Sequence, residues 1–465
     1  MVDGLGARQL PVGCGLFMTM MAVQEAGDAL RDLIKGDLKS PPEIRKVAFR
    51  LPGQRTGSRD FVTHWLHRYP AKMFHRIPRI ILEQISGRGA LTVLDPFCGS
   101  GTVLLESILL GHRAIGIDVN PLARLISRVK TTAISPSHLQ EHLPAIRNRL
   151  TRMTVEPGKD DALDFWFKRK VRTQLQCLAA SVNGIEHKQC RDFFSLCVSS
   201  CVRPCSWADP TIAPPVRLHS ERIPIAGERY KANYRHARGL KADDVLKEFE
   251  KVTSENLRRM KELFEYKTLG KAEVLSSSYH ASETGLRDGS IDLVLTSPPY
   301  CGAQKYVRSL RLEMLVLGIS PKIIAEADKR TLGTERVPST GVGQWDGSTN
   351  SRVARLIRKV NERNSIRGFM LSEYLKYLKE FAREIRRVLK PGGEAFVTFG
   401  SDHVSGICVD TAALFAEMAI EHSLYHVGTL IDTIPSRGMM TIRHSSANTI
   451  TDERVVWLRR VESND

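Results

Sequence analysis

Short apolar segments alternate with amphipathic segments in two separate parts of the chain. Residues 91–94 (LTVL) predict a buried strand, which leads into a loop that contains glycine. The segment 103–110 follows with the length and composition of a helix, and Gly111 suits the left-handed position at which helices often end. A second apolar segment, 114–118, ends in an aspartate. Strand, glycine loop, helix and strand predict the first half of a doubly wound α/β unit.

A similar pattern returns in the last third of the chain. Residues 290–296 (SIDLVLT) predict another buried strand, and residues 371–389 carry apolar positions at helical spacing before the helix breaker Pro391. Shorter segments predict further elements: helices at 76–86 and 411–420, and strands at 394–399 and 453–458. The expected fold class is α/β, with a Rossmann-like core.

Three stretches of the chain lack this alternation. Residues 1–60 carry little pattern and predict a loosely packed N-terminal arm. Residues 131–270 and 318–366 are polar and basic. We therefore expect one α/β core that is interrupted by two insertions, with much of the basic charge in the insertions.

The charge balance is unusual for a soluble protein. Lys and Arg total 68 against 51 Asp and Glu, which gives a formal net charge of +17 and a pI near 9.6. Such a surplus favours an anionic partner, of which nucleic acid is the usual one, over a membrane surface. No apolar segment approaches the ~18 residues of a membrane span, so we expect no membrane association.

The nine cysteines do not form a recognisable framework. There is no Cys-x2-Cys pair and the count is odd, which favours a reduced, cytoplasmic setting. Cys197, Cys201 and Cys205 recur every four residues, as on one face of a buried helix that Pro204 would end. We expect no metal site among these cysteines and Cys190, and we interpret three nearby histidines as structural or facing nucleic acid: His64, His67 and His75.

The first candidate site is the loop after the strand at 91–94. Gly99 and Gly101 permit a tight turn and the close approach of a small molecule to the backbone. Asp95 can accept a ligand ammonium, and Phe97 can pack on an apolar edge. The loop lacks both the Gly-Lys-Ser/Thr ending of a phosphate loop and the third glycine of a dinucleotide loop. Its candidate cofactor-binding residues are Asp95, Pro96, Phe97, Cys98, Gly99, Ser100, Gly101 and Thr102.

Asp118 is a second candidate because it ends the next strand. An acid at this position commonly accepts hydrogen bonds from the ribose hydroxyls of an adenosine-containing cofactor.

The third candidate is the turn Ser297-Pro298-Pro299-Tyr300, which follows the strand at 290–296. Two prolines donate no N–H and fix φ, so the turn can present oxygens to an exocyclic amine. The two N–H groups of such an amine would donate to a Ser297 oxygen and to the Pro298 carbonyl. These hydrogen bonds would raise the nucleophilicity of the amine nitrogen. Tyr300 would offer a stacking face to the base.

These motifs together resemble the bacterial amino-methylating DNA methyltransferases, which modify N4 of cytosine or N6 of adenine. Residues 94–106 resemble their cofactor loop and residues 296–300 their catalytic loop. Residues 69–74 (YPAKMF) resemble the segment that closes over the methionine end of the cofactor, and this resemblance implies that Lys72 and Phe74 line the cofactor site. Residues 387–393 are similar to a helix-to-strand junction of many methyltransferases.

The resemblance implies S-adenosylmethionine as cofactor and duplex DNA as substrate, with the target base flipped out of the helix. A serine before the prolines resembles the cytosine-N4 subgroup more than the adenine-N6 subgroup. Site-specific DNA methylation is typical of restriction-modification, so a cognate restriction endonuclease is a partner that the resemblance leaves open. The implied organisation is an arm (1–60), the cofactor-binding half of the core (61–130), an insertion for target recognition (131–270), the catalytic-loop segment (271–317), a basic insertion (318–366) and the C-terminal half of the core (367–465).

Two other functions fit part of the pattern. A tRNA guanine-N2 methyltransferase also pairs such a loop with a Pro-Pro-Tyr turn, but typically has Asp before the prolines and an N-terminal RNA-binding module. A DNA-binding module on a decayed core is disfavoured by the two intact loops. Candidate groups for holding DNA are basic residues beside aromatic ones: Lys168, Arg169, Lys170 and Arg172 beside 165–167, Arg308 and Arg311 beside Tyr306, and Arg352, Arg355, Arg358, Lys359, Arg363 and Arg367.

Overall fold

A computed structural model of the chain describes residues 27–28, 42–49, 62–70, 72–85, 87, 89–152, 161–276, 279–301, 306–333, 352–434 and 450–461. Most of the expected arm and the middle of the expected insertion 318–366 lie outside these described residues.

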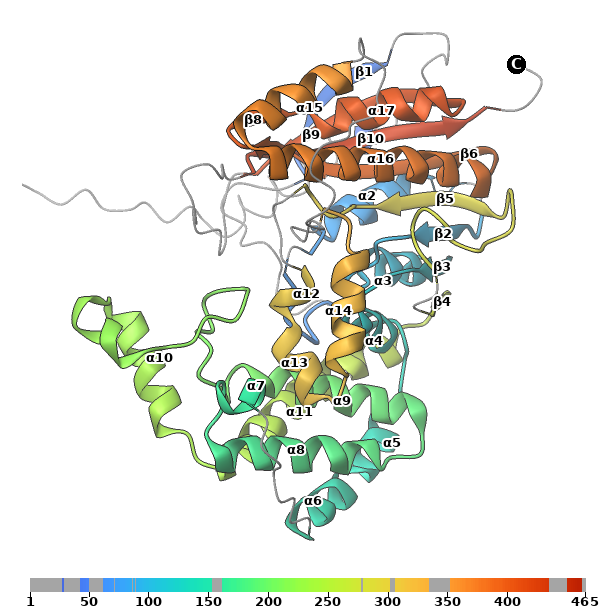
Figure 1. The fold of residues 1–465 in the computed structure, drawn as a ribbon. Helices are drawn as coiled ribbons and strands as arrows, with labels where there is room; N and C mark the ends of the chain where they lie inside the picture. Colours follow the sequence, from blue (N-terminus) through green and yellow to red (C-terminus); the bar gives the residue numbers. More distant parts are fainter. Residues whose placement is uncertain are drawn as a thin grey trace, which may run out of the picture.

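The centre of the fold is an eight-stranded sheet in the order β1-β9-β10-β6-β5-β2-β3-β4 (Figure 1). Every neighbouring pair is parallel except the two pairs made by β10, which runs antiparallel between β6 and β9. The strands are β1 (Glu43–Val47), β2 (Thr92–Asp95), β3 (Arg113–Gly116), β4 (Lys271–Val274), β5 (Ile291–Thr296), β6 (Leu389–Gly400), β9 (Leu424–Thr433) and β10 (Asp452–Arg460).

The strand order confirms the α/β, Rossmann-like expectation. Counted from β2, the first five core strands lie in the order third, second, first, fourth, fifth, which is the order of a doubly wound sheet. The chain moves from β2 to β3 on one side and later returns to β5 on the other side of β2. The point between β2 and β5 is therefore the topological switch point, where such sheets bind ligands.

Both faces of the sheet are covered, because successive strand residues point to opposite sides. Val93 and Leu295 pack with the helix α2 (Arg76–Ile85) on one face. Leu94 and Val294 belong to the apolar cluster on the other face. That cluster also contains residues of two later helices, α16 (Ser365–Val388) and α17 (Thr411–Glu421).

The expected insertion 131–270 forms a helical region whose buried apolar cluster continues into the helices α3 (Thr102–Leu109) and α4 (Pro121–Lys130) beside the sheet. Its central helix is α9 (Lys188–Val202), on which Cys197 and Cys201 are completely buried, which confirms the expected cysteine-bearing helix. The other helices of this stretch are α5 (Pro136–Glu141), α6 (Leu143–Arg152), α7 (Asp161–Asp164), α8 (Arg169–Asn183), η2 (Ser220–Ile225), α10 (Glu228–Gly239) and α11 (Asp243–Phe264).

The helical region extends beyond the expected boundary at 270. The helices α12 (Tyr306–Ser309) and α13 (Arg311–Val316) follow the turn Ser297–Tyr300 in sequence, but α13 packs against α8 and α9. Figure 1 shows α12 and α13 between the sheet and the helical region. The remaining elements are α3 (Thr102–Leu109) and α4 (Pro121–Lys130) beside the sheet, α14 (Pro321–Arg330), α15 (Arg352–Arg363), and the two-stranded sheet of β7 (Asp402–Val404) and β8 (Ile407–Val409).

The expectation of a loosely packed arm over residues 1–60 is wrong for its described part. The strand β1 extends the sheet by pairing with β9, and Phe49 is completely buried. The backbone N–H of Phe49 donates to the carboxylate of Asp432 on β9 (3.1 Å). The sequence did not predict β9, which is the strand that β1 requires as a neighbour.

Among the described residues, no helix is both long enough and apolar enough to cross a membrane.

Candidate functional site

The three candidate loops meet at the carboxyl ends of three neighbouring strands. Asp95 ends β2 and Thr296 ends β5, and the Thr296 hydroxyl donates to Asp95 Oδ1 at 2.6 Å. On the other side of β2, the Gly99 N–H donates to Oδ2 of Asp118, just after β3 (2.9 Å). Parallel pairing aligns these strand ends, so segments about 200 residues apart in sequence form one site.

Asp95 lies at the centre of this site and is almost completely buried. Its Oδ1 also accepts the Phe97 N–H at 3.2 Å, whereas Oδ2 has no hydrogen-bond partner among the described residues. Burial raises the pKa of Asp95 to about 7, although the Thr296 and Phe97 hydrogen bonds oppose that rise. A carboxylate in this state is suited to a cationic ligand, which would offset the cost of its burial.

Asp118 is held by two backbone donors, one to each carboxylate oxygen. Besides Gly99, the Asn120 N–H donates to Oδ1 at 2.7 Å. Burial nevertheless raises the pKa of Asp118 to about 6. Each carboxylate oxygen has further lone-pair capacity, so both remain able to accept a ligand hydroxyl.

The loop Asp95–Thr102 adopts a conformation that only glycine adopts readily at two positions. Gly99 and Gly101 have φ values of 49° and 72°. A Cβ at Gly99 would lie 3.3 Å from the Tyr69 ring, and a Cβ at Gly101 would lie within 3.0 Å of Ser127. The loop is therefore folded tightly between the segment before α2 and the helix α4.

Most of the other loop residues face the protein interior. Pro96 and Cys98 are buried, and Cys98 Sγ lies 3.7 Å from Ser127 Oγ. The Ser100 hydroxyl accepts a hydrogen bond from the buried Lys130 ammonium at 3.4 Å. Phe97 packs on Phe381 of α16 with ring centroids 5.2 Å apart, which fits its expected apolar contact. The half-buried positions in the loop are Phe97 and Gly99.

Two buried polar atoms near the loop have hydrogen-bonding capacity to spare. The Thr102 hydroxyl and Nδ2 of Asn120 have no partner among the described residues. Asn120 caps α4 by accepting from the N–H groups of Leu122 and Ala123, a role that the sequence Asn-Pro predicts but that we did not assign. Buried polar atoms are normally satisfied, so these two fit a site that hydrogen-bonds a bound molecule.

The segment 69–74 reaches the loop through Tyr69 rather than through the two residues expected to line the site. Lys72 donates to the His64 carbonyl at 3.0 Å and lies 3.9 Å from the centre of the Trp65 ring. Burial lowers the pKa of Lys72 to about 8. Phe74 packs against the apolar cluster around α2. Tyr69 is the first residue of the segment 69–74. An aromatic residue at that position was the feature of the sequence that could have indicated this contact.

A buried network of charged and polar side chains underlies the loop. His64 Nε2 lies 2.7 Å from Glu106 Oε1 on α3, and the Arg79 guanidinium lies 3.5 Å from the other Glu106 oxygen. Burial lowers the pKa of His64 and raises the pKa of Glu106 to about 7. Of the two roles expected for His64, structural or facing nucleic acid, its burial and its contact with Glu106 fit the structural one, in positioning α3 and the loop before it.

The turn Ser297–Tyr300 is fixed against β6 and β10. The Ser297 hydroxyl donates to the Thr398 carbonyl at 3.2 Å, which leaves its oxygen lone pairs available as acceptors. Tyr300 is 8% exposed, and its hydroxyl donates to Glu453 at 3.2 Å. Its ring occupies the space that a Cβ at Gly400 would fill. A stacking role for this ring stays a prediction.

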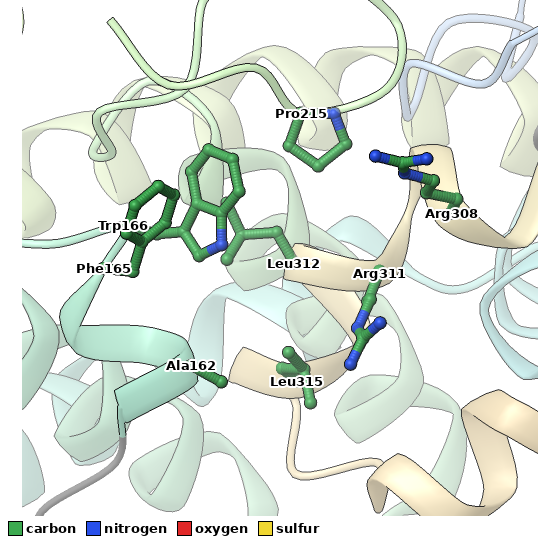
Figure 2. A pocket seen from close by; sticks show the side chains of 8 residues that line it. All are labelled: Ala162, Phe165, Trp166, Pro215, Arg308, Arg311, Leu312 and Leu315. Atoms are coloured by element: carbon green, nitrogen blue, oxygen red, sulfur yellow. The ribbon is translucent and has the colours of Figure 1, made fainter. Parts of the chain in front are cut away.

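The expected basic pair Arg308 and Arg311 and the aromatic residues Phe165 and Trp166 of another expected group line a hollow of about 410 Å³, whereas the basic residues of that second group do not line it. Figure 2 shows Phe165 and Trp166 on one side of it and the guanidinium groups of Arg308 and Arg311 on the other. Both arginines are exposed, and neither forms an ion pair within the part of the chain that the structure describes. Arg217, which the sequence did not single out, lies 4.8 Å from the Phe165 ring.

Not all of the proposed DNA-facing residues are exposed. Arg172 is 2% exposed and pairs with Asp164 at 2.7 Å, so its assignment to a DNA-facing group is wrong. Lys168 donates to the carbonyls of Arg238 and Leu240. On α15, the basic residues Arg352, Arg355, Arg358, Lys359 and Arg363 are exposed, and Arg352 pairs with Glu417.

Comparison with known proteins agrees with this geometry. A family model described as DNA methylase matches residues 48–127. The chain is 25% identical over 424 residues to the type II methyltransferase M.MvaI of Kocuria varians, covering 86% of this chain and 90% of that protein. It is 21% identical over 300 residues to the type II methyltransferase M.BsoBI of Geobacillus stearothermophilus, which covers 60% of this chain and 57% of that protein.

A shorter likeness involves an RNA-modifying enzyme. The tRNA (guanine(10)-N2)-dimethyltransferase of Methanothermobacter thermautotrophicus is 35% identical over 52 residues, which covers 11% of this chain and 16% of that protein.

The sheet order and the three loops at its switch point form a Rossmann-like α/β core with one candidate ligand site. The matched segment 48–127 contains the whole loop Asp95–Thr102 and Asp118. The family-model match over residues 48–127 and the similarity to M.MvaI over most of both chains support an amino-methylating DNA methyltransferase, a class whose cofactor is S-adenosylmethionine.

The packing around Gly101 leads to a first prediction. Gly101→Ala should destabilise the fold by about 1–2 kcal/mol or more, because an L-residue resists the left-handed conformation and the new Cβ would overlap Ser127. Thermal unfolding should show a lower Tm. Gly87→Ala is the matched control, since a Cβ there meets nothing within 4 Å. An unchanged Tm for Gly101→Ala would contradict the described loop.

Proposed function

We propose that the chain transfers a methyl group from S-adenosylmethionine to N4 of cytosine within a specific sequence of duplex DNA. The observation that carries the proposal is the hydrogen bond between Thr296 and Asp95, which joins the two loops. A methyl donor held over the first loop would then be next to an amine held by the second. M.MvaI and M.BsoBI, to which the chain is similar, are type II methyltransferases.

The cofactor would be held by the loop Asp95–Thr102 and by Asp118, and when bound it supplies an electrophilic methyl group. The free oxygen of Asp95 would accept the ligand ammonium, and Asp118 would accept the ribose hydroxyls. Lys72 and Phe74 contribute from the adjacent segment by positioning it, since Tyr69 contacts the loop directly.

The turn Ser297–Tyr300 would hold the target amine. The Ser297 hydroxyl is committed as a donor to Thr398, so its oxygen faces an amine only as an acceptor. The Pro298 carbonyl would accept the second N–H, and Pro299 keeps the turn rigid. Tyr300 anchors the turn to β10 through Glu453 and would present its remaining open surface to the base. The amine proton would leave to solvent after methyl transfer, because a serine hydroxyl is too weak a base.

The DNA would lie between the sheet and the helical region. Base flipping costs a few kcal/mol, which contacts to the opened strand must offset. The hollow of Phe165, Trp166, Arg308 and Arg311 combines surfaces for stacking with phosphate-binding groups. One side of the hollow is made by α12 and α13, the first helices described after the turn Ser297–Tyr300 in sequence.

The test of this function is mass spectrometry of nucleosides after incubation of DNA and tRNA with the protein and isotope-labelled S-adenosylmethionine. We expect label in N4-methylcytosine from DNA. Label in N6-methyladenine would overturn the base assignment, and label only in tRNA guanine would overturn the DNA substrate. Ser297→Ala is the control for a contaminating enzyme, because loss of one acceptor should slow transfer about tenfold.

The pKa of Asp95 leads to a prediction for cofactor binding. Below about pH 7 the Asp95 carboxyl is protonated and neutral, so it attracts an ammonium less strongly. The affinity for S-adenosylhomocysteine, measured by titration calorimetry, should therefore rise as the pH increases from about 6 to about 8. Asp95→Asn should bind more weakly and lose most of this dependence. The same pH profile in wild type and Asp95→Asn would exclude Asp95 as the ammonium partner.

The hollow leads to a prediction for the salt dependence of DNA binding. Replacing Arg308 and Arg311 by Gln should reduce the slope of log Kobs against log salt by about 1–2, because each phosphate contact contributes about 0.9. Arg113→Gln is the control: it removes an exposed arginine at the amino end of β3, on the opposite edge of the sheet. Equal slopes for wild type and the double variant would place the DNA elsewhere.

A further inference from the structure

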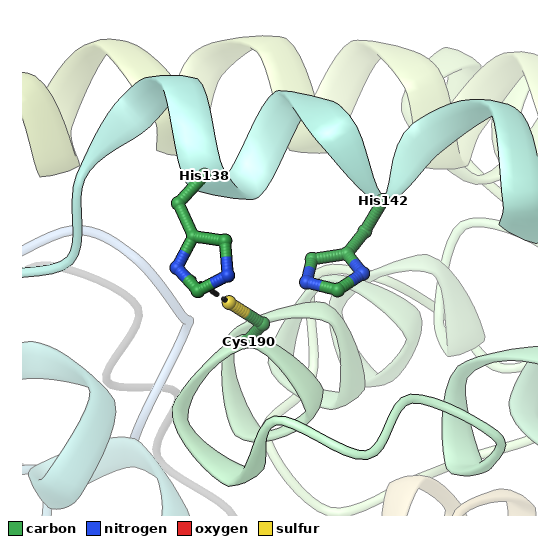
Figure 3. A group of neighbouring side chains, drawn as sticks. All are labelled: His138, His142 and Cys190. Carbon is green, nitrogen blue, oxygen red and sulfur yellow. Dashed lines mark hydrogen bonds between the residues drawn. The ribbon is translucent and has the colours of Figure 1, made fainter.

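A cluster of three histidines and one cysteine lies outside the three candidate loops and takes no part in the proposed chemistry. His138 and His142 are one turn apart at α5, and His187 and Cys190 are in the first turn of α9. Figure 3 shows the Cys190 thiol between the rings of His138 and His142. The sequence spacing of the cysteines did not reveal this cluster, because the partners of Cys190 are histidines from other segments.

The distances between the sulfur and the nearest ring nitrogens are similar to those between the ligand atoms of a metal site. Cys190 Sγ lies 3.2 Å from His187 Nδ1 and 3.9 Å from His138 Nδ1. A ring nitrogen of His138, a ring nitrogen of His142 and the sulfur all lie within 4.8 Å of one another. In a tetrahedral zinc site the sulfur-to-nitrogen distance is about 3.6 Å, given Zn–S of about 2.3 Å and Zn–N of about 2.0–2.1 Å. The two sulfur distances bracket that value. His187 is close to the sulfur but is not part of the group whose donor atoms all lie within 4.8 Å of one another, so its side chain would have to rotate to complete a tetrahedral set.

The cluster also contains hydrogen-bonding capacity that the protein leaves unused. His142 Nε2 is buried and has no partner among the described residues. Figure 3 shows the His142 ring with one nitrogen turned toward the thiol. Cys190 is completely buried. A cluster held only by hydrogen bonds would satisfy the thiol but not this nitrogen, whereas a metal ion would use both.

We propose that His138, His142, His187 and Cys190 bind one zinc ion. The Cys190 thiol would lose its proton to solvent, and the thiolate and three neutral imidazole nitrogens would each donate a lone pair to the metal. His187 Nδ1 now accepts the Cys190 N–H at 3.4 Å and would exchange this capping contact for the metal. Four protein donors leave no open position, so the site is structural rather than catalytic.

The position of the cluster indicates what the zinc ion would do. The helix α5 follows α4 after a short connection, and α4 lies against β4 of the core. The helix α9 is at the centre of the helical region and also packs on α4 and α11. A metal between α5 and α9 would therefore fasten the first segment of the insertion to its central helix and, through α4, to the core.

The test is metal analysis of the full-length protein after saturation with zinc and dialysis. We expect about one zinc ion per chain in the wild type and in Cys201→Ala, which removes another buried thiol from the same helix. Cys190→Ala and His142→Ala should retain less than about a fifth of that amount. Zinc should raise the Tm of the wild type and leave the Tm of Cys190→Ala unchanged.

A second measurement avoids dependence on variants that fail to fold. Cobalt(II) added to the wild-type protein should give the visible bands of tetrahedral coordination together with a thiolate-to-metal charge-transfer band, and zinc should abolish both. Folded wild-type protein that retains no zinc would overturn the proposal. Zinc retained by Cys190→Ala, zinc lost equally from Cys201→Ala, or a cobalt spectrum without the thiolate band would overturn it as well. None of these measurements depends on methyl transfer.

Discussion

The hydrogen bond from Thr296 to Asp95 is the contact on which the candidate active site depends. It is buried between β2 and β5, neighbouring parallel strands that come from opposite ends of the methyltransferase core. Because both strands end at the same edge, the loop that follows each is delivered to the same place. The hydrogen bond also fixes one oxygen of Asp95 and leaves the other for a ligand. The pairing of β2 with β5 in the sheet is therefore also what brings the two loops of the candidate site together.

Burying two carboxyl groups around this contact costs the protein stability when no ligand is bound. Asp95 and Asp118 are acids in a low-dielectric setting, and burial raises the pKa of each. Neither has an ion-pair partner within the described part of the chain. In the proposed binding mode a ligand ammonium would offset the burial of Asp95, and ligand hydroxyls would hydrogen-bond to Asp118. Beneath the loop, the His64–Glu106 pair and Lys130 supply the rigid support that such a site needs.

The helical region contributes to the site by its attachment. The helices α12 and α13 continue the chain from the catalytic turn, yet α13 packs against α8 and α9. The helix that follows the proposed amine-binding turn in sequence is therefore part of the packing of the helical region. The aromatic and basic hollow between α7 and α13 lies on this same connection. If DNA binds at this hollow as proposed, target binding and the turn Ser297–Tyr300 would be close in sequence, and the proposed zinc cluster would stiffen the helical region that α13 packs against.

The sequence by itself determined the strands β2, β3 and β5, the loops after them and the buried cysteine helix, because each depends on neighbours along the chain. Tertiary structure decided the rest. The strand β1 forms because β9 lies beside it. Arg172 is buried in an ion pair with Asp164, whereas Arg308 is exposed. Tyr69, rather than Lys72, contacts the glycine loop. The His138, His142, His187 and Cys190 cluster likewise joins segments that carry no mutual signal. Local pattern follows from backbone geometry, whereas contacts between distant segments follow from how the layers pack.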